Sequence, residues 1–194
     1  TPMMKLRRSL ISLVAVMFGG ALLAGPVVAP AQAAPALGEQ SLAAVLTADG
    51  NGTFDDNWYD YDIVTQAVLG VLAAKPTSNV SLLTDGSVAL TAFIPNDRAF
   101  RVLAHSLTHR WQKTEEGVFN TLVKKLGVDK IEKILLYHVV PGATILAADA
   151  LQANGAKLAT GLPGASIKVR VIGRNVPQII LHDRDFNSPN PRVN

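Results

Sequence analysis

The histidine residues of this chain form few combinations that could do chemistry. His105 and His109 are four residues apart in a segment with helical spacing, so their imidazoles could face the same way. That spacing suits a pair of zinc ligands, but the segment lacks the Glu of a HExxH motif and has no third ligand nearby. We therefore interpret the pair as two solvated histidines.

A loop rich in Asp and Gly resembles the beginning of a calcium-binding loop. Asp49, Asn51, Thr53 and Asp55 lie at alternating positions, as ligands do in an EF-hand. An EF-hand also needs Gly at its sixth position and an acid at its twelfth, where this chain has Phe54 and Asp60. We interpret the segment as an Asx-rich surface loop and predict no metal site, with Asp49, Asn51 and Asp55 as the weak candidates for cation ligands.

The sequence lacks the motifs of the common catalytic sites. It has no Gly-x-Ser-x-Gly elbow, no Walker A loop and no Gly-x-Gly-x-x-Gly loop. Because it contains no cysteine, disulfides, thiolate nucleophiles and thiolate zinc sites are excluded. We predict a protein without catalytic activity or cofactor. One alternative stays open, a secreted hydrolase that combines His138 or His105 with Asp97 or Ser106.

An aromatic cluster lies directly before a predicted helix. Trp58, Tyr59 and Tyr61 are interspersed with aspartates. Exposed aromatic side chains could stack on sugars or anchor a partner. We favour packing of Trp58 and Tyr61 against the start of the helix. A small-ligand or cation-binding protein that uses the loop at residues 49–60 is the second open alternative.

The first 33 residues have the layout of a secretory signal peptide. A positive region with Lys5, Arg7 and Arg8 precedes an apolar run at residues 10–24, and the sequence Ala-Gln-Ala at residues 31–33 is typical of a cleavage site. The apolar run is shorter than the roughly 20 residues of a membrane span. We predict a secreted, cell-surface protein of a bacterial kind, with an uncleaved anchor as the alternative contact with a membrane.

Charge and length limit the remaining possibilities. The chain has 194 residues, of which 48% are hydrophobic, and its net charge is +3. After residue 33, the 15 basic residues are balanced by 15 acidic residues. The mature chain therefore has the size and composition of one folded domain, and nucleic acid is not an expected partner.

Hydrophobic periodicity predicts an α+β fold, with helices in the first part and strands in the last. We expect helices at residues 41–46, 61–74, 99–107, 115–126 and 129–136, the last two separated by Gly127. We expect strands at residues 88–94, 139–140, 157–159, 167–172 and 178–182.

Two segments carry a resemblance to a known family. The segment TAFIPNDRAF (residues 91–100) resembles the first motif of the fasciclin (FAS1) domain, and LYHVVPGA (residues 136–143) resembles the second. The resemblance covers residues 61–194. Residues 34–60, with a helix and the Gly/Asp-rich loop, resemble an extension found in bacterial members.

The resemblance implies a β-sandwich or wedge with helices packed on one side. It also implies an adhesion or matrix-interaction module. We expect Phe93 and Phe100 to be core anchors, Pro95 to end a strand, and Asn96 or Asp97 to cap the next helix. The motif residues with expected structural roles are Thr91, Phe93, Pro95, Asp97, Phe100, Val139 and Pro141.

The Tyr-His pair of the second motif is the candidate binding site that the resemblance implies. Tyr137 and His138 match positions implicated in partner contact in some members, although we favour for His138 a structural role that ties two segments together. The expected partner is an extracellular protein or polysaccharide. We expect the closing strand or strands of the fasciclin domain to be missing from the C-terminal end, and we therefore expect an exposed sheet edge that favours self-association.

Overall fold

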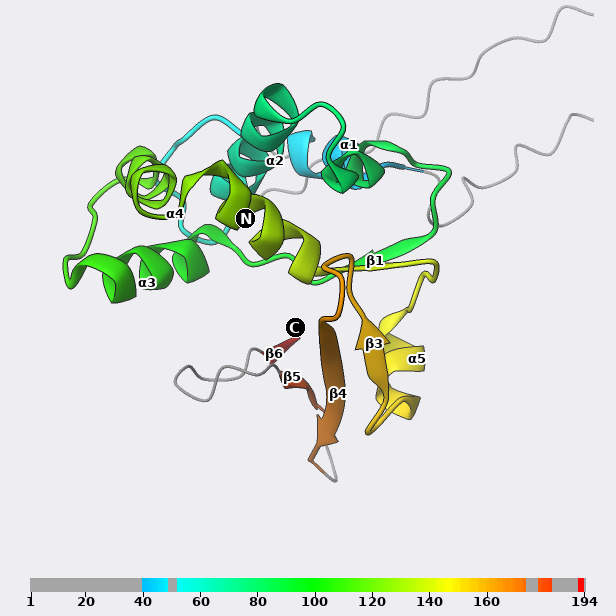
Figure 1. Ribbon diagram of the computed structural model, residues 1–194. Coiled ribbons are helices and arrows are strands. Elements are labelled where there is room, and N and C mark those ends of the chain that lie inside the picture. The colour runs from blue at the N-terminus through cyan, green and yellow to red at the C-terminus, as the bar shows by residue number, and fades with distance from the viewer. Residues whose placement is uncertain (1–39, 49–51, 174–177, 183–191, 194) are drawn as a thin grey trace, which may run out of the picture. The chain divides into compact units, whose positions relative to one another are not determined.

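The computed structural model describes residues 40–48, 52–173, 178–182 and 192–193 (Figure 1). The predicted signal peptide and two of the weak cation candidates, Asp49 and Asn51, lie outside these residues. None of the helices in this described part is long and apolar enough to cross a membrane.

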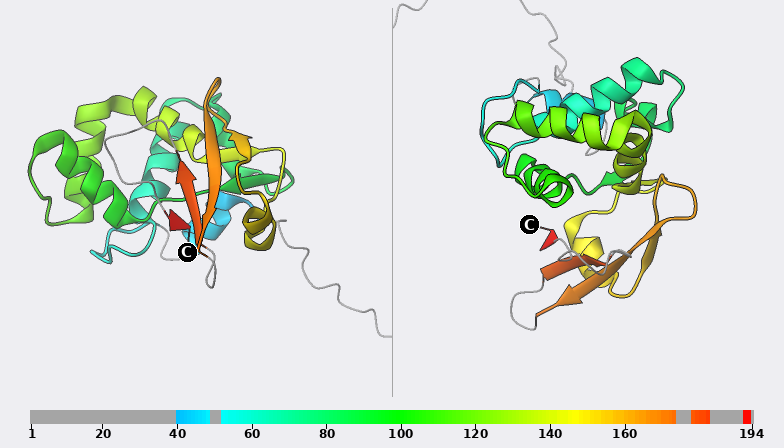
Figure 2. Two further views of the ribbon diagram at one scale, coloured as in Figure 1. Left: turned by 90° about the horizontal axis from the view of Figure 1, so that it is seen from below. Right: turned by 60° about the vertical axis from the view of Figure 1, so that its left-hand side comes forward.

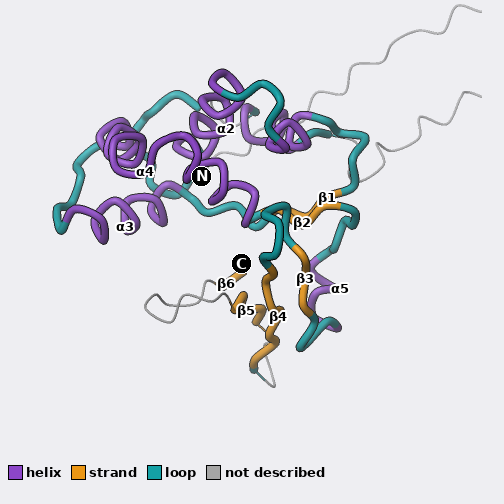
Figure 3. Tube along the Cα trace, in the orientation of Figure 1, coloured by secondary structure: helices purple, strands orange, loops and turns teal. Residues whose placement is uncertain are grey.

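Four α-helices lie within residues 42–137, drawn in purple in Figure 3, and they confirm the helices predicted from periodicity. They are α1 (Leu42–Thr47), α2 (Asp62–Ala74), α3 (Asp97–Thr108) and α4 (Glu115–Tyr137). The two helices predicted on either side of Gly127 are one element with a kink, because Gly127 has a φ of 72° that breaks the helical path. The 3-10 helix η1 (Asn79–Thr84) and helix α5 (Ala147–Gln152) were not predicted.

Two antiparallel sheets complete the α+β fold. Strands β1 (Leu90–Ala92) and β2 (Val139–Pro141) form one sheet, with Thr91 opposite Val140. The other has the order β3-β4-β5-β6, made of β3 (Lys157–Ala159), β4 (Ser166–Ile172), β5 (Gln178–His182) and β6 (Arg192–Val193). Strand β6, which pairs with β5, was not predicted.

The strand predicted at residues 88–94 is shorter than expected. Only residues 90–92 belong to β1, because their partner β2 has three residues and ends at Pro141. The chain then turns at Gly142, whose amide donates to the carbonyl of Ala89 at 2.8 Å. The length of β1 is therefore set by its partner, which a local sequence pattern does not show.

Buried apolar side chains form two clusters. The larger one lies among α1, α2, η1, α3 and α4, which Figure 2 shows grouped together, and includes Ile63 and Phe100. The smaller one joins α5 to β4 and β5 and includes Ile167 and Val169. Phe100 is a buried anchor as predicted, whereas Phe93 is half-buried and packs against the smaller cluster. The two phenylalanines of the first motif thus point to different clusters.

Candidate functional site

The two fasciclin-like motifs lie side by side. Besides the β1-β2 pairing, the amide of Phe93 donates to the carbonyl oxygen of His138 at 2.9 Å. The imidazole Nδ1 of His138 lies 2.8 Å from the carbonyl oxygen of Ile134, in the preceding turn of α4. The backbone of His138 therefore joins the motifs, while this imidazole contact stays within its own helix.

Three further motif residues hold the region around β2. The Thr91 hydroxyl donates to the carbonyl of Ala143 and accepts from the amide of Ile145, both at 2.8 Å. Val139 is buried in the larger cluster, and its carbonyl accepts from the amide of Gly161 at 2.7 Å. These bonds tie the segment after β2, and the turn between β3 and β4, to the two motifs.

The Tyr-His pair that the resemblance marks for binding is half-buried. The two rings meet edge to face with centroids 5.7 Å apart, and Tyr137 packs against the smaller cluster. Much of each ring is therefore used inside the protein. Partner contact through Tyr137 and His138 stays a prediction.

Asp97 has a different role from the helix cap that we considered. Asn96 caps α3, since its side-chain oxygen accepts from the amide of Ala99 at 3.2 Å. Asp97 instead accepts from the first amides of α2, those of Asp62 at 3.1 Å and Ile63 at 3.0 Å. The side chain of Tyr61, the N-cap residue of α2, makes no hydrogen bond to the first amides of that helix. The carboxyl group of Asp97 in α3 caps α2 in its place.

The position of Asp97 also changes its acidity. The side chain is fully buried, and this burial raises its pKa from 3.8 to about 8. A hydrogen bond with the Asp60 side chain and the negative charges of Glu115 and Asp60 act in the same direction, while the Ile63 amide opposes them. Asp97 thus behaves as a neutral acid near pH 7.

The loop at residues 52–60 is held against two helices. At its start, the carbonyl of Gly52 accepts from the Gln66 side chain of α2 at 2.7 Å. Gly52 has a φ of 68°, and a Cβ there would lie 2.7 Å from Cγ2 of Thr65, so no larger residue fits without a shift. Further along, the amide of Asp55 donates to Oε2 of Glu115 at 3.0 Å. The loop therefore bridges α2 and the first turn of α4.

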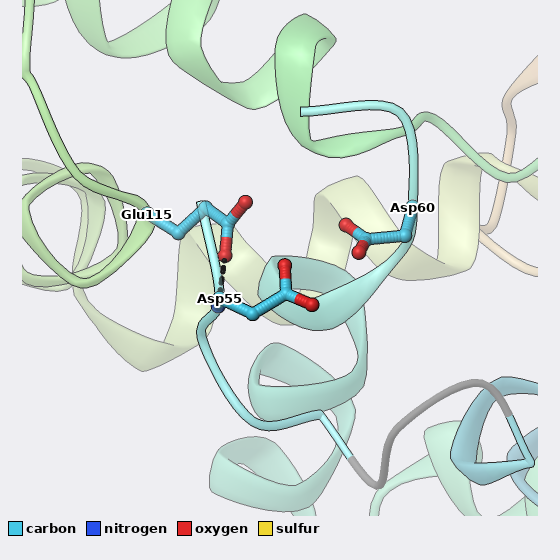
Figure 4. A group of neighbouring side chains, drawn as sticks. All are labelled: Asp55, Asp60 and Glu115. Atoms are coloured by element: carbon cyan, nitrogen blue, oxygen red, sulfur yellow. Dashed lines mark hydrogen bonds between the residues drawn. The ribbon is translucent and has the colours of Figure 1, made fainter. Parts of the chain in front are cut away.

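Three carboxylates converge where this loop meets α4 (Figure 4). Asp55, Asp60 and Glu115 each place a carboxylate oxygen within 4.8 Å of the others, and their side chains point toward one another. We call these three residues the acidic cluster. Burial raises the pKa of Glu115, and the charges of Asp60 and Asp55 raise it further. A second group that could hold a cation comprises Asp60, Asp62 and Asp97.

Sequence reasoning found only part of this cluster. Asp55 was a weak candidate for a cation ligand, but the other expected ligands were Asp49 and Asn51 of the same loop. Glu115 is 60 residues away and follows a helix cap, Thr114, which alone explains an acid at that position. The sequence also did not mark Asp60 as a member of the cluster, because it is one of several aspartates in the loop. The tertiary fold, which packs the loop on α4, brings them together.

The same loop also contributes to a second surface feature. An open pocket of about 460 Å³ is lined by two arginines, three aromatic residues and a valine, which we call the aromatic–arginine pocket: Trp58, Tyr59, Arg98, Arg101, Val102 and Trp111. The guanidinium of Arg101 lies 4.2 Å from the ring centroid of Trp58 and 5.7 Å from that of Trp111. Its Nε donates to the carbonyl of Gln112 at 2.9 Å, which fixes its position.

The aromatic residues before α2 divide into packed and exposed side chains. Trp58 is half-buried and packs against the larger cluster, as predicted. Tyr61, for which we also favoured packing, is 36% exposed, and Tyr59 is 69% exposed. In addition, Trp111, which also lines the pocket, is 57% exposed. The sequence did not indicate this contribution, because Trp111 follows α3 and is far along the chain from Trp58 and Tyr59.

The residues proposed for a hydrolase or zinc site have other partners. His105 stacks on Trp111 with ring centroids 4.0 Å apart, and His109 ends α3 in the left-handed conformation, with a φ of 56°. The Ser106 hydroxyl donates to the carbonyl of Leu103 at 2.7 Å, and the Asp97 carboxyl caps α2. These contacts give each side chain a local structural role.

Comparison with known proteins identifies one family. A family model described as the fasciclin domain matches residues 69–183, which is more than half of the chain. No curated protein and no solved structure matches the chain.

Proposed function

Since the chain belongs to the fasciclin domain family, we propose that it is a secreted or cell-surface module that binds an extracellular matrix component without catalysis. Fasciclin domains are usually extracellular, are typical of adhesion modules and are generally non-catalytic. The signal peptide predicted at residues 1–33 supports export. In this proposal the partner is an acidic polysaccharide, and the aromatic–arginine pocket is the surface that binds it.

The observation that carries this choice is the combination of flat aromatic faces with guanidinium groups in one pocket. Tyr59 and Trp111 keep large parts of their rings exposed, and such rings can stack on the apolar faces of sugar rings. Arg98 is exposed beside them, and guanidinium groups pair with carboxylate or sulfate in a bidentate way. Among the residues that the structure describes, no acidic side chain lines the pocket.

The pocket is also held in shape by its own contacts. Trp58 and Gln112 fix the guanidinium of Arg101, and His105 stacks on the ring of Trp111. The amide of Arg98 donates to the carbonyl of Trp58 at 2.9 Å, which holds the loop wall against α3. A surface that is fixed before binding loses less side-chain entropy when the ligand arrives.

Binding of heparin, a sulfated polysaccharide that contains uronates, tests the proposal. We expect the full chain to bind heparin but not neutral dextran. Arg98→Ala, which removes one charge-assisted contact, and Trp111→Ala, which removes one stacking surface, should each weaken heparin binding about tenfold. Isothermal titration calorimetry at fixed salt measures the affinities. Arg170→Ala is the matched control, because Arg170 is an exposed arginine on β4 outside the pocket, and it should keep the wild-type affinity.

Two further variants separate this surface from the Tyr-His pair. Tyr137→Phe and His138→Gln should leave the heparin affinity unchanged. Loss of binding only in these two variants would move the binding surface to the second motif. Absence of any binding to heparin, or an equal loss in the Arg170 control, would contradict the proposal.

A further inference from the structure

We propose that Asp55, Asp60 and Glu115 form a Ca²⁺ site that fastens the loop at residues 52–60 to the N-terminus of α4. This inference does not depend on the polysaccharide proposal. It rests on a buried oxygen that has no hydrogen-bond partner among the described residues, on the convergence of three carboxylates and on the chemistry of the donor set.

The first observation concerns Glu115. Its side chain is fully buried, and Oε2 accepts from the amide of Asp55. The other oxygen, Oε1, has no hydrogen-bond partner in the part of the chain that the structure describes. A buried carboxylate oxygen without a partner is costly, and a bound cation would remove this cost.

The second observation is that this side chain is directed at other acids. In Figure 4 the carboxylates of Asp55 and Asp60 face the carboxylate of Glu115 from the loop. Like charges at this separation repel each other, so the arrangement needs either protons or a cation between the groups. A divalent ion would make the three groups favourable neighbours.

The ligand type favours Ca²⁺. The three carboxylate oxygens lie within 4.8 Å of one another, so all three can reach one ion. Ca²⁺ accepts six to eight oxygen ligands in flexible geometry, whereas Mg²⁺ demands near-ideal octahedral geometry and gives up its water ligands reluctantly. Oxygen donors alone, without His or Cys, are the ligands of hard cations. Asp55 is exposed, so an ion and its remaining water ligands can reach the site from solvent.

A bound ion would have a structural effect beyond the cluster. The same loop carries Trp58 and Tyr59, which form one wall of the aromatic–arginine pocket. The amide of Glu115 also donates to Oδ1 of Asp56 at 3.2 Å, so the ion would add to contacts that already join loop and helix. The site would therefore hold the loop in the conformation that presents these two aromatic residues.

Calcium titration of the chelator-treated full chain tests the inference. We expect isothermal titration calorimetry to show one Ca²⁺ ion bound with a Kd of about 10⁻⁵–10⁻³ M and Mg²⁺ to bind at least about tenfold more weakly. Saturating Ca²⁺ should raise the unfolding temperature by about 4–8 °C relative to EDTA. Glu115→Gln and Asp55→Asn should abolish both effects. Asp55 is exposed, so its variant is the safer test of folding.

Glu116→Gln is the matched control. Glu116 is the exposed neighbour of Glu115 in the first turn of α4, so this change removes the same charge without touching the cluster. It should keep the wild-type response to Ca²⁺. A folded wild-type chain that shows neither heat of binding nor a shift in unfolding temperature would overturn the site. An unchanged Ca²⁺ affinity in Asp55→Asn would also overturn it, as would a loss of Ca²⁺ affinity in Glu116→Gln as large as that in Asp55→Asn.

Discussion

Replacing Asp97 with Ala is expected to lower the free energy of unfolding by about 3 kcal/mol. The carboxyl of Asp97 is the acceptor for the two amides that begin α2, and it is fully buried. A buried donor that loses its acceptor costs roughly 1–3 kcal/mol, and two donors lose theirs here. Urea unfolding measures the change.

A surface acid provides the contrast for this prediction. Asp129 is 77% exposed and pairs with Lys75 at 2.8 Å, and Asp129→Ala should cost less than about 1 kcal/mol, as exposed ion pairs do. Asp97→Asn should lie between the two, because an amide has one acceptor oxygen where the carboxyl uses two. A loss below about 1 kcal/mol for Asp97→Ala would show that α2 does not depend on this cap.

The stability of the protein in EDTA is expected to fall as the pH rises from about 4 toward about 8. The pKa of Asp97 in the folded protein is about 8, well above its ordinary value of 3.8. Between these values the folded state holds a proton that the unfolded state has lost, so raising the pH favours unfolding by up to about 1.4 kcal/mol per pH unit. The acids that face Asp97 are Asp60, Asp62 and Glu115.

Urea unfolding at pH 5 and pH 7 measures this dependence. We expect the wild-type protein to lose about 2 kcal/mol across this interval and Asp97→Asn, which cannot ionise there, to lose much less. The exposed acids whose pKa is lowered, such as Asp129 beside Lys75, act in the opposite direction but contribute little. A stability that rises with pH, or the same slope in Asp97→Asn, would contradict the neutral state of Asp97.

The sequence predicted most of the elements because their signals are local. The apolar spacing within residues 61–74 and the cap at Asn96 both act over a few residues, and both features are present. Helix α5 and the 3-10 helix η1 were missed since each has six residues, too few for a clear period. The pairing of β1 with β2 was not predicted, because register depends on two distant segments.

The functional residues were predictable only where one segment supplies them. Trp58 and Tyr59 were singled out as a cluster, but Arg98, Arg101 and Trp111 come from α3 and the turn after it. Asp97 was expected, together with Asn96, only as a cap of the helix that begins beside it, because a polar residue between a strand and a helix normally caps that helix. Its bonds to α2 arise because the loop before α2 packs beside α3, as shown by the amide of Asp97, which donates to the carbonyl of Asp60 at 3.1 Å.

The most direct test of the binding surface uses the two tryptophans of the chain, Trp58 and Trp111, which both line the aromatic–arginine pocket. Their indole N–H signals in a ¹⁵N–¹H correlation spectrum report on the pocket alone. Titration with heparin fragments should shift both indole signals and leave the backbone amide signals of Tyr137 and His138 in place. Unchanged indole signals, with shifts centred on Tyr137 and His138 or on another face, would contradict the account.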